Sequence, residues 1–154
     1  MLELAIRTRW IMPHDADAIT AIDQAAFSAP WSKRDILTHM GQRTVMGQVA
    51  VDGDGRILGY LFQELRPTLR RITRMAVRPE LRRRGIGSIL VNEFRNRLCV
   101  TRRTKLIADI PEPALGLQLF FRALEFKATK LLKSEEQTFY RFEVGVPAPI
   151  DFVI

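Results

Sequence analysis

Residues 77–88 read VRPELRRRGIGS, in which three consecutive arginines precede two glycines separated by a single isoleucine. The stretch follows a strand-like segment at residues 69–77 and opens an apolar helical pattern over residues 85–98. The first amides of a helix have no intrahelical partner and carry the positive end of its dipole. Gly85 and Gly87 leave that backbone bare, and the arginines add charge-assisted hydrogen bonds. The turn is therefore predicted to bind a pyrophosphate or a similar group.

Other anion-binding motifs fit this stretch less well. A dinucleotide-binding fingerprint would need a third glycine where Leu90 stands, and a P-loop would need a lysine and a Ser/Thr after its second glycine. A lone G-x-G is also compatible with a tight turn, and the arginines with a solvated face. Nucleic-acid sites that stack bases interleave aromatic and basic residues, whereas residues 66–84 contain no aromatic residue. This composition argues against a nucleic-acid partner.

Length and composition predict one globular domain over residues 1–154, with 47% hydrophobic and 27% charged residues. The net charge of +7 favours anionic partners. The single cysteine, Cys99, cannot form an internal disulfide, which favours a reducing compartment, and its helical pattern predicts a buried thiol. The N-terminal residues do not resemble a signal peptide, and no apolar run approaches the ~18 residues of a membrane span. We therefore expect a cytoplasmic protein without a membrane partner.

The hydrophobic periodicity predicts the element order β-α-α-β-β-β-α-β-α-β-β. The first strand is expected around Leu2 to Ile6, a first helix after Asp15, and a second helix from a capping box at Ser32 and Asp35. The DGDG sequence at residues 52–55 predicts a hairpin. The later elements are expected at residues 69–77, 85–98, 105–110, 115–124, 126–133 and 138–144. This order predicts an α/β (α+β) fold with one mixed, mostly antiparallel sheet flanked by helices.

The longer signature V-x-P-x-x-R-x-x-G-x-G strongly resembles the acetyl-CoA motif of the GNAT superfamily of N-acetyltransferases. It is formed by Val77, Pro79, Arg82, Gly85 and Gly87. The element order resembles that superfamily over nearly the whole chain, so the resemblance implies a GNAT fold with acetyl-CoA as cosubstrate and no metal. It also implies that the cofactor contacts the backbone of Met75, Ala76 and Val77 and the turn formed by Arg82, Arg83, Arg84, Gly85, Ile86, Gly87 and Ser88.

Residues 27–32, FSAPWS, resemble the F-x-x-P-W-S segment of the ribosomal-protein-alanine N-acetyltransferases. That resemblance implies a primary amine as acceptor, in particular the α-amine at the N-terminus of a protein or peptide. It also implies that Asp109, which stands where the family has a glutamate, is the catalytic base and reaches the amine through water. The alternative for Asp109 is a structural carboxylate at a strand end, and Trp31 is more typical of a packing residue.

The sequence departs from this family at three positions. Phe121 replaces the tyrosine that serves as general acid, Ala114 replaces an asparagine that contacts the cofactor, and Glu125 replaces a glycine. A thiol with a pKa near ~8.5 can leave as a thiolate unaided, so we expect a slower, acid-deficient enzyme. A hydroxyl added at residue 121 is expected to raise the rate if it reaches the sulfur. Tyr140 and Glu64 could replace the acid, although both also fit structural roles.

Two other functions remain compatible with the sequence. One is a small-molecule amine acetyltransferase on the same fold, and the other is a non-catalytic module that binds CoA or nucleic acid. Neither the acceptor amine nor the oligomeric state can be read from the residues. The tail at residues 145–154 ends in apolar residues that could pack against the core or against a second subunit in a homodimer. His14 and His39 lack metal-ligand companions, so ordinary surface roles are expected for both.

Overall fold

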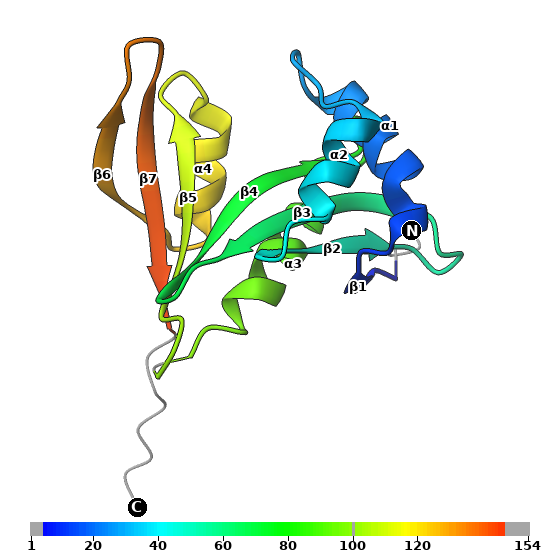
Figure 1. Cartoon of the computed structure of the whole chain (residues 1–154), viewed down its shortest axis with the longest axis horizontal. Helices are drawn as coiled ribbons and strands as arrows, with labels where there is room; N and C mark the ends of the chain where they lie inside the picture. Colours follow the sequence, from blue (N-terminus) through cyan, green and yellow to red (C-terminus); the bar gives the residue numbers. More distant parts are fainter. Residues whose placement is uncertain (1–4, 100, 147–154) are drawn as a thin grey trace, which may run out of the picture.

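The computed structural model describes residues 5–99 and 101–146, in which one seven-stranded sheet runs through the molecule (Figure 1). The strand order is β1-β2-β3-β4-β5-β7-β6, and all neighbouring strands are antiparallel except β4 and β5. The strands are β1 (Arg7–Trp10), β2 (Val45–Val51), β3 (Ile57–Leu65), β4 (Leu69–Val77), β5 (Lys105–Pro111), β6 (Lys127–Lys133) and β7 (Thr138–Gly145). The α-helices are α1 (Ala16–Ala26), α2 (Lys33–Met40), α3 (Ile86–Arg95) and α4 (Leu115–Ala123), with short 3₁₀ turns η1 (Pro13–Asp15) and η2 (Pro79–Leu81). The predicted element order and mixed sheet are confirmed.

The sheet separates two hydrophobic cores. On one face, α1 and α2 pack against β2, β3 and β4, with Ile19, Ile36 and Tyr60 fully buried. On the other face, α3 and α4 cover the sheet through residues such as Leu90 and Phe121. Because successive strand residues point to opposite faces, strand β4 supplies both cores, with Ala76 on the α1 side and Met75 and Val77 on the α3 side.

The local turn and capping signals form as predicted. The amide of Asp35 donates to Ser32 Oγ at 3.1 Å, and the amide of Ser32 donates to the Asp35 carboxylate at 2.9 Å, which completes the capping box of α2. The DGDG turn joins β2 and β3, and Gly55 takes the left-handed φ of +82° that favours glycine.

Two predicted boundaries differ from the structure. Strand β1 begins at Arg7 rather than near Leu2, and residues 1–4 lie outside the described residues. Helix α3 ends at Arg95 rather than at Leu98, because the chain turns at Asn96 while Leu98 still packs into the core. The helical pattern therefore extended too far, and the prediction that Cys99 is buried is wrong, since its thiol is exposed.

Strand β4 changes its pairing at Thr73. Phe62 pairs with Arg74 and Gln63 with Ile72, so Thr73 is an extra, bulged residue. On the opposite edge, β4 pairs with β5 only from Leu69 to Arg71, after which the two strands diverge (Figure 1). The predicted tail beyond Val146 lies outside the described residues.

Candidate active site

The basic turn has an unusual backbone conformation. After η2 the chain passes through Arg83 and Gly85, whose φ angles are +64° and +81°. A Cβ on Gly85 would meet no atom within 4 Å. Glycine is therefore favoured here by the left-handed backbone conformation and not by lack of space for a side chain. Gly85 is also the N-cap of α3, where it has no side chain to compete for the first helix amides. Residues 82–84 are exposed, so their cations lie at the surface beside the uncapped start of α3.

Gly87 is required for a different reason. A Cβ at this position would lie 3.3 Å from the ring of Phe120 on α4 and 3.7 Å from the terminal methyl of Met75 on β4. The glycine therefore brings the first turn of α3 against α4 and β4. A side chain here would press on the Phe120 ring, in the first turn of α3 next to the basic turn.

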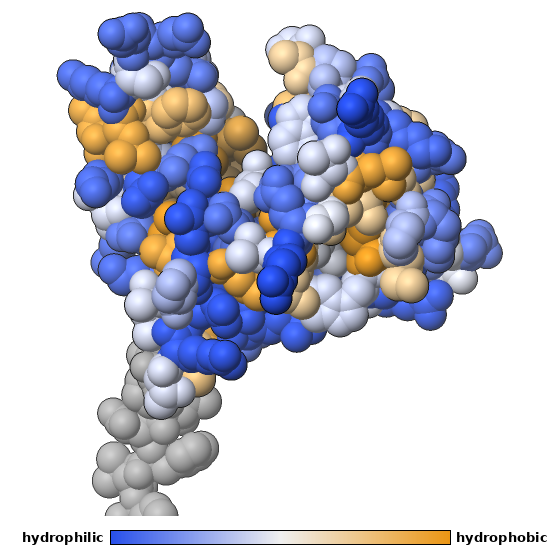
Figure 2. All heavy atoms as spheres, viewed as in Figure 1, coloured by the Kyte–Doolittle hydropathy of each residue, from blue (hydrophilic) through white to orange (hydrophobic). Residues whose placement is uncertain are grey.

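The backbone of residues 75–77 has a free edge. One edge pairs with β3, through Leu61, Tyr60 and Gly59, and the other edge has no partner strand in the described part of the chain because β5 has already diverged. Figure 2 shows a notch in the surface between the part that carries β5, β7 and α4 and the part that carries α1 and α2. An extended chain with amide groups can hydrogen-bond to such an edge.

These features fit acetyl-CoA. The uncapped amides and arginines of residues 82–88 suit its pyrophosphate, and the free β4 edge suits the amides of its pantetheine arm. Ala114, the N-cap of α4, contributes no side-chain hydrogen bond, so one family contact is missing. The structure thus brings together all the residues that the sequence predicted for the cofactor, on β4 and at the start of α3.

Asp109 lies on β5 beside the diverging edge, with 14% of its side chain exposed. Arg141 on β7 donates to both of its oxygens, at 2.8 and 3.1 Å, and these bonds raise the pKa of Arg141. Arg71 on β4 approaches the same carboxylate at 3.7 Å. Each carboxylate oxygen has two acceptor directions, so Asp109 keeps room for one further donor on each oxygen.

Sequence reasoning missed the role of His39. The prediction of an ordinary surface histidine is wrong, because the ring packs edge-on against Trp31 and Phe62, with centroids 5.0 and 5.1 Å apart, and its Nε2 lies 2.8 Å from Thr73 Oγ1. Burial is the main cause that lowers its pKa; Arg74 acts in the same direction and Glu64 opposes it. The histidine thus joins α2 to the bulge of β4 as a neutral ring at physiological pH.

Segment 27–32 is held against β4 by a buried ion pair. Asp23 on α1 is fully buried and accepts hydrogen bonds from Arg74, at 2.7 and 2.9 Å, from the Tyr60 hydroxyl and from the amide of Trp31. The Arg74 guanidinium also lies 3.9 Å from the ring centre of Phe27 and 4.3 Å from that of Trp31. No sequence signal could have paired residues 23 and 74, which are far apart in the chain.

Phe121 does not face the notch. Its side chain is 1% exposed and packs against Phe126 and Phe142, with ring centroids 5.0 and 6.4 Å away. Of the suggested substitutes for a general acid, Tyr140 packs against the core on the α3 side, and Glu64 forms an ion pair with Arg66, with 2.8 Å between Oε1 and Nε. Both substitutes therefore have structural partners.

Phe121→Tyr is expected to destabilise the protein by about 1–3 kcal/mol, because the added hydroxyl would be buried among aromatic rings without a partner. We expect no gain in rate, in contrast to the expectation from the sequence. Urea unfolding and steady-state kinetics of both proteins check this. A variant that is as stable as the wild type and several-fold faster would show that the hydroxyl reaches the thioester after all.

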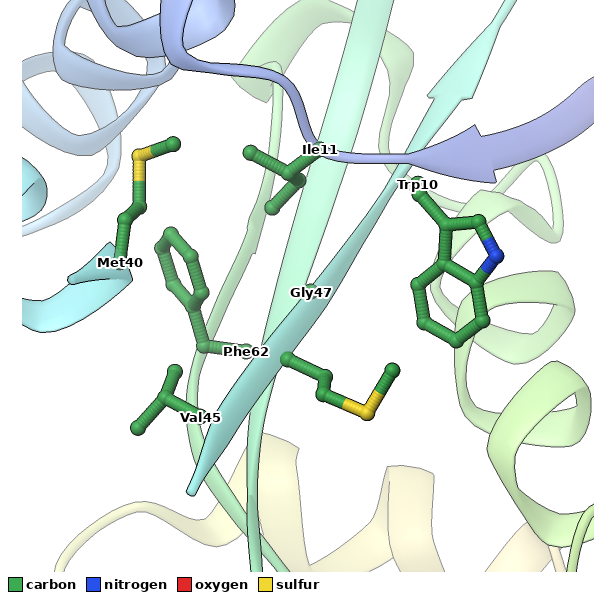
Figure 3. A pocket seen from close by; sticks show the side chains of 7 residues that line it. Trp10, Ile11, Met40, Val45, Gly47 and Phe62 are labelled. Carbon is green, nitrogen blue, oxygen red and sulfur yellow. The ribbon is translucent and has the colours of Figure 1, made fainter. Parts of the chain in front are cut away.

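The structure also contains a pocket of about 220 Å³ at the free end of β2 (Figure 3). Figure 3 shows Met40, Phe62 and Ile11 on one side of the strand and Trp10 on the other. A Cβ on Gly47 would overlap Ile11 and Phe62, so the glycine allows their close approach. The pocket is lined mainly by apolar side chains and contains none of the predicted cofactor or catalytic residues.

Within residues 5–99 and 101–146, no helix is long and apolar enough to cross a membrane. No group of three or more His, Cys, Asp or Glu side chains among them could hold a metal ion. His14 is exposed and lies 3.5 Å from the Asp15 carboxylate.

Residues 45–141 match the family model described as an acetyltransferase (GNAT) domain. A search of curated proteins finds no match. The fold is similar to that of the ribosomal-protein-S18-alanine N-acetyltransferase from Escherichia coli, at 13% identity over 97% of this chain and 99% of that one, with a TM-score of 0.80. It is also similar to NAA60 from Arabidopsis thaliana in complex with acetyl-CoA, at 16% identity over 92% and 99% of the chains and a TM-score of 0.79. A phosphinothricin acetyltransferase from Sinorhizobium meliloti in complex with AcCoA shares 22% identity over 93% and 89%, with a TM-score of 0.74.

Proposed function

The chain belongs to the acetyltransferase (GNAT) family and is an acetyl-CoA-dependent N-acetyltransferase, and from that premise we propose that its acceptor is the N-terminal α-amine of a protein or peptide. The observation that carries the proposal is the position of segment 27–32. Arg74 holds Phe27 and Trp31 on the α1 side of β4, while Gly87 and the basic turn lie on the α3 side. Cofactor and acceptor would therefore approach the diverging strands from opposite faces.

The structural neighbours support this choice of acceptor without deciding it. One of them is named as a ribosomal-protein-S18-alanine N-acetyltransferase, and another, NAA60, is in complex with a bisubstrate analogue. Others act on small molecules, such as a phosphinothricin acetyltransferase and a spermidine/spermine N-acetyltransferase. Incubation with acetyl-CoA and a panel of peptides, polyamines and aminoglycosides, read by mass spectrometry, distinguishes the peptide acceptor from the small-molecule acceptor. CoA binding without acetylation of any compound would favour the non-catalytic module.

The residues divide the work of acetyl transfer. Acetyl-CoA supplies an activated thioester when it is bound. The turn at residues 82–88 holds its pyrophosphate, and the free edge at residues 75–77 orients the arm that ends in the thioester. Asp109 accepts a proton from the amine, directly or through a water molecule, while Arg141 fixes the orientation of its carboxylate. An α-amine has a pKa of about 8, against about 10.4 for a lysine side chain. A larger fraction of an N-terminal acceptor is therefore already neutral, and the base has to remove fewer protons.

Asp109→Asn is expected to lower kcat, most strongly at low pH, where fewer acceptor amines are already neutral. The fall is expected to be about 10²–10⁴-fold, with little change in the Kd for CoA. The pH profile of kcat and calorimetric titration of CoA check this. Glu143→Gln is the matched control, because Glu143 is a half-buried carboxylate on the neighbouring strand, 3.9 Å from Lys105. Full activity of Asp109→Asn at every pH would show that the proton goes elsewhere.

A cytoplasmic location is part of the proposal, and it rests on the free, exposed thiol of Cys99, which suits a reducing compartment. Cell fractionation with an antibody to the chain tests it. A homodimer remains a prediction that light scattering of the purified protein checks.

A further inference from the structure

Arg71 occupies a special place in the sheet. It is the last residue of β4 that pairs with β5, opposite Ile107, so it marks the point from which the two strands diverge. Its side chain is 37% exposed and lies 3.7 Å from the carboxylate of Asp109, on the neighbouring strand. Any group that binds Arg71 therefore lies next to the proposed base.

The guanidinium of Arg71 has unused hydrogen-bonding capacity. Its distances to Asp109 Oδ2 and Glu64 Oε2 are 3.7 and 3.8 Å, longer than the 2.7–3.2 Å of a hydrogen bond. Its Nε is buried and has no hydrogen-bond partner among the described residues. An arginine with open donors beside a substrate site is suited to a planar, two-oxygen acceptor.

The two carboxylates near Arg71 are already bonded to other arginines. Arg141 donates to both oxygens of Asp109, at 2.8 and 3.1 Å. The guanidinium of Arg66 lies 2.8 Å from Glu64. Three guanidinium groups thus share two carboxylates, and the excess positive charge falls on Arg71, which has the longest contacts.

We infer that Arg71 binds a carboxylate of the acceptor, so that the enzyme prefers peptides with Asp or Glu as the second or third residue. The inference rests on the proposed function, because it places the acceptor amine near Asp109. The contacts of Arg71 to Asp109 and Glu64 are too long for hydrogen bonds. A bidentate pair with the acidic side chain of the acceptor would supply the hydrogen bonds that these contacts lack. Free amino acids carry the same chemistry, but segment 27–32 favours the longer acceptor.

The test compares two peptides that differ only in Asp or Asn at the second or third position, together with a free amino acid. The wild type is expected to show a kcat/KM about tenfold or more higher for the Asp peptide, mainly through KM, with the preference falling as salt is added. Arg71→Gln is expected to remove the preference, and Arg71→Lys to keep part of it. Arg56→Gln is the control, because its guanidinium is 53% exposed and pairs with Glu80, a carboxylate that Arg71 does not share.

The outcomes separate this inference from the proposed function. Acetylation of the Asp and Asn peptides at equal rates, or an unchanged preference in Arg71→Gln, overturns the inference and leaves the peptide acceptor in place. If Arg71→Gln does not fold, Arg71→Lys decides. A kcat/KM ratio between the Asp and Asn peptides that equals that of the wild type and does not change with salt concentration would also overturn the inference. Acetylation of the free amino acid alone overturns the choice of a peptide, and acetylation of no peptide or amino acid overturns the proposed function as well.

Discussion

Gly87→Glu is expected to abolish CoA binding, with a Kd at least about a hundredfold higher than that of the wild type. A Cβ at this position would lie 3.3 Å from the Phe120 ring and 3.7 Å from Met75, in the first turn of α3, so the added carboxylate brings negative charge next to the basic turn. There that carboxylate would take the place of the pyrophosphate and repel it. Because the Phe120 ring has to shift by a few tenths of an ångström, a modest fall in Tm is also expected.

Isothermal titration of CoA into the folded variant measures this effect. Gly145→Glu is the matched control, since it makes the same charge change at the exposed end of β7, where a Cβ meets only the Thr104 carbonyl at 3.8 Å. The control is expected to bind CoA like the wild type. Equal affinity in a folded Gly87→Glu variant would remove the basic turn from the account of cofactor binding.

Asp23→Ala is expected to destabilise the protein by about 3–5 kcal/mol, because it leaves the half-buried Arg74 guanidinium and the buried Tyr60 hydroxyl without their shared acceptor. Since Arg74 also holds Phe27 and Trp31, we expect KM for peptides to rise. Urea unfolding gives the free energy change. Asp17→Ala is the control on the same helix, because its 81% exposed carboxylate pairs with Lys33 in solvent and is expected to contribute less than about 1 kcal/mol. A cost for Asp23→Ala no larger than that of the control would contradict the role of the pair.

The same carboxylate predicts a pH dependence. Burial raises the pKa of Asp23, but the hydrogen bonds from Arg74, Tyr60 and the Trp31 amide outweigh it, so that the pKa is lowered overall. A carboxylate with a lowered pKa stabilises the fold fully above its unfolded value of about 3.9 and loses that contribution as the pH falls through the folded value. Wild-type stability is therefore expected to fall below about pH 4, and Asp23→Asn to lose less stability over the same range.

Local signals made much of the fold predictable. Ser32 and Asp35 have the spacing of a capping box, and the DGDG turn depends only on the backbone freedom of its glycines. Both features are found at the predicted residues. The glycine-rich turn before α3 was predictable for the same reason, since its glycines and arginines are contiguous, while its role in binding the cofactor stays a prediction.

The rest depends on contacts between distant residues. The bulge at Thr73 carries no glycine or proline signal, and it reverses the alternation that a regular strand would keep. The partner of Asp109 lies on a strand formed 32 residues later, and Phe121 turns into the core because Phe126 and Phe142 surround it. Sequence periodicity reports which face is apolar, but it does not report which side chains meet across the sheet.

Mass spectrometry of peptides incubated with acetyl-CoA and the purified chain tests the central claim most directly. Each peptide should carry both a free α-amine and a lysine, so that fragmentation locates the added acetyl group. The account predicts acetylation at the α-amine, dependent on acetyl-CoA and lost in Gly87→Glu but kept in Gly145→Glu. Acetylation only at lysine, only of polyamines or aminoglycosides, or of nothing in the presence of bound CoA would contradict it.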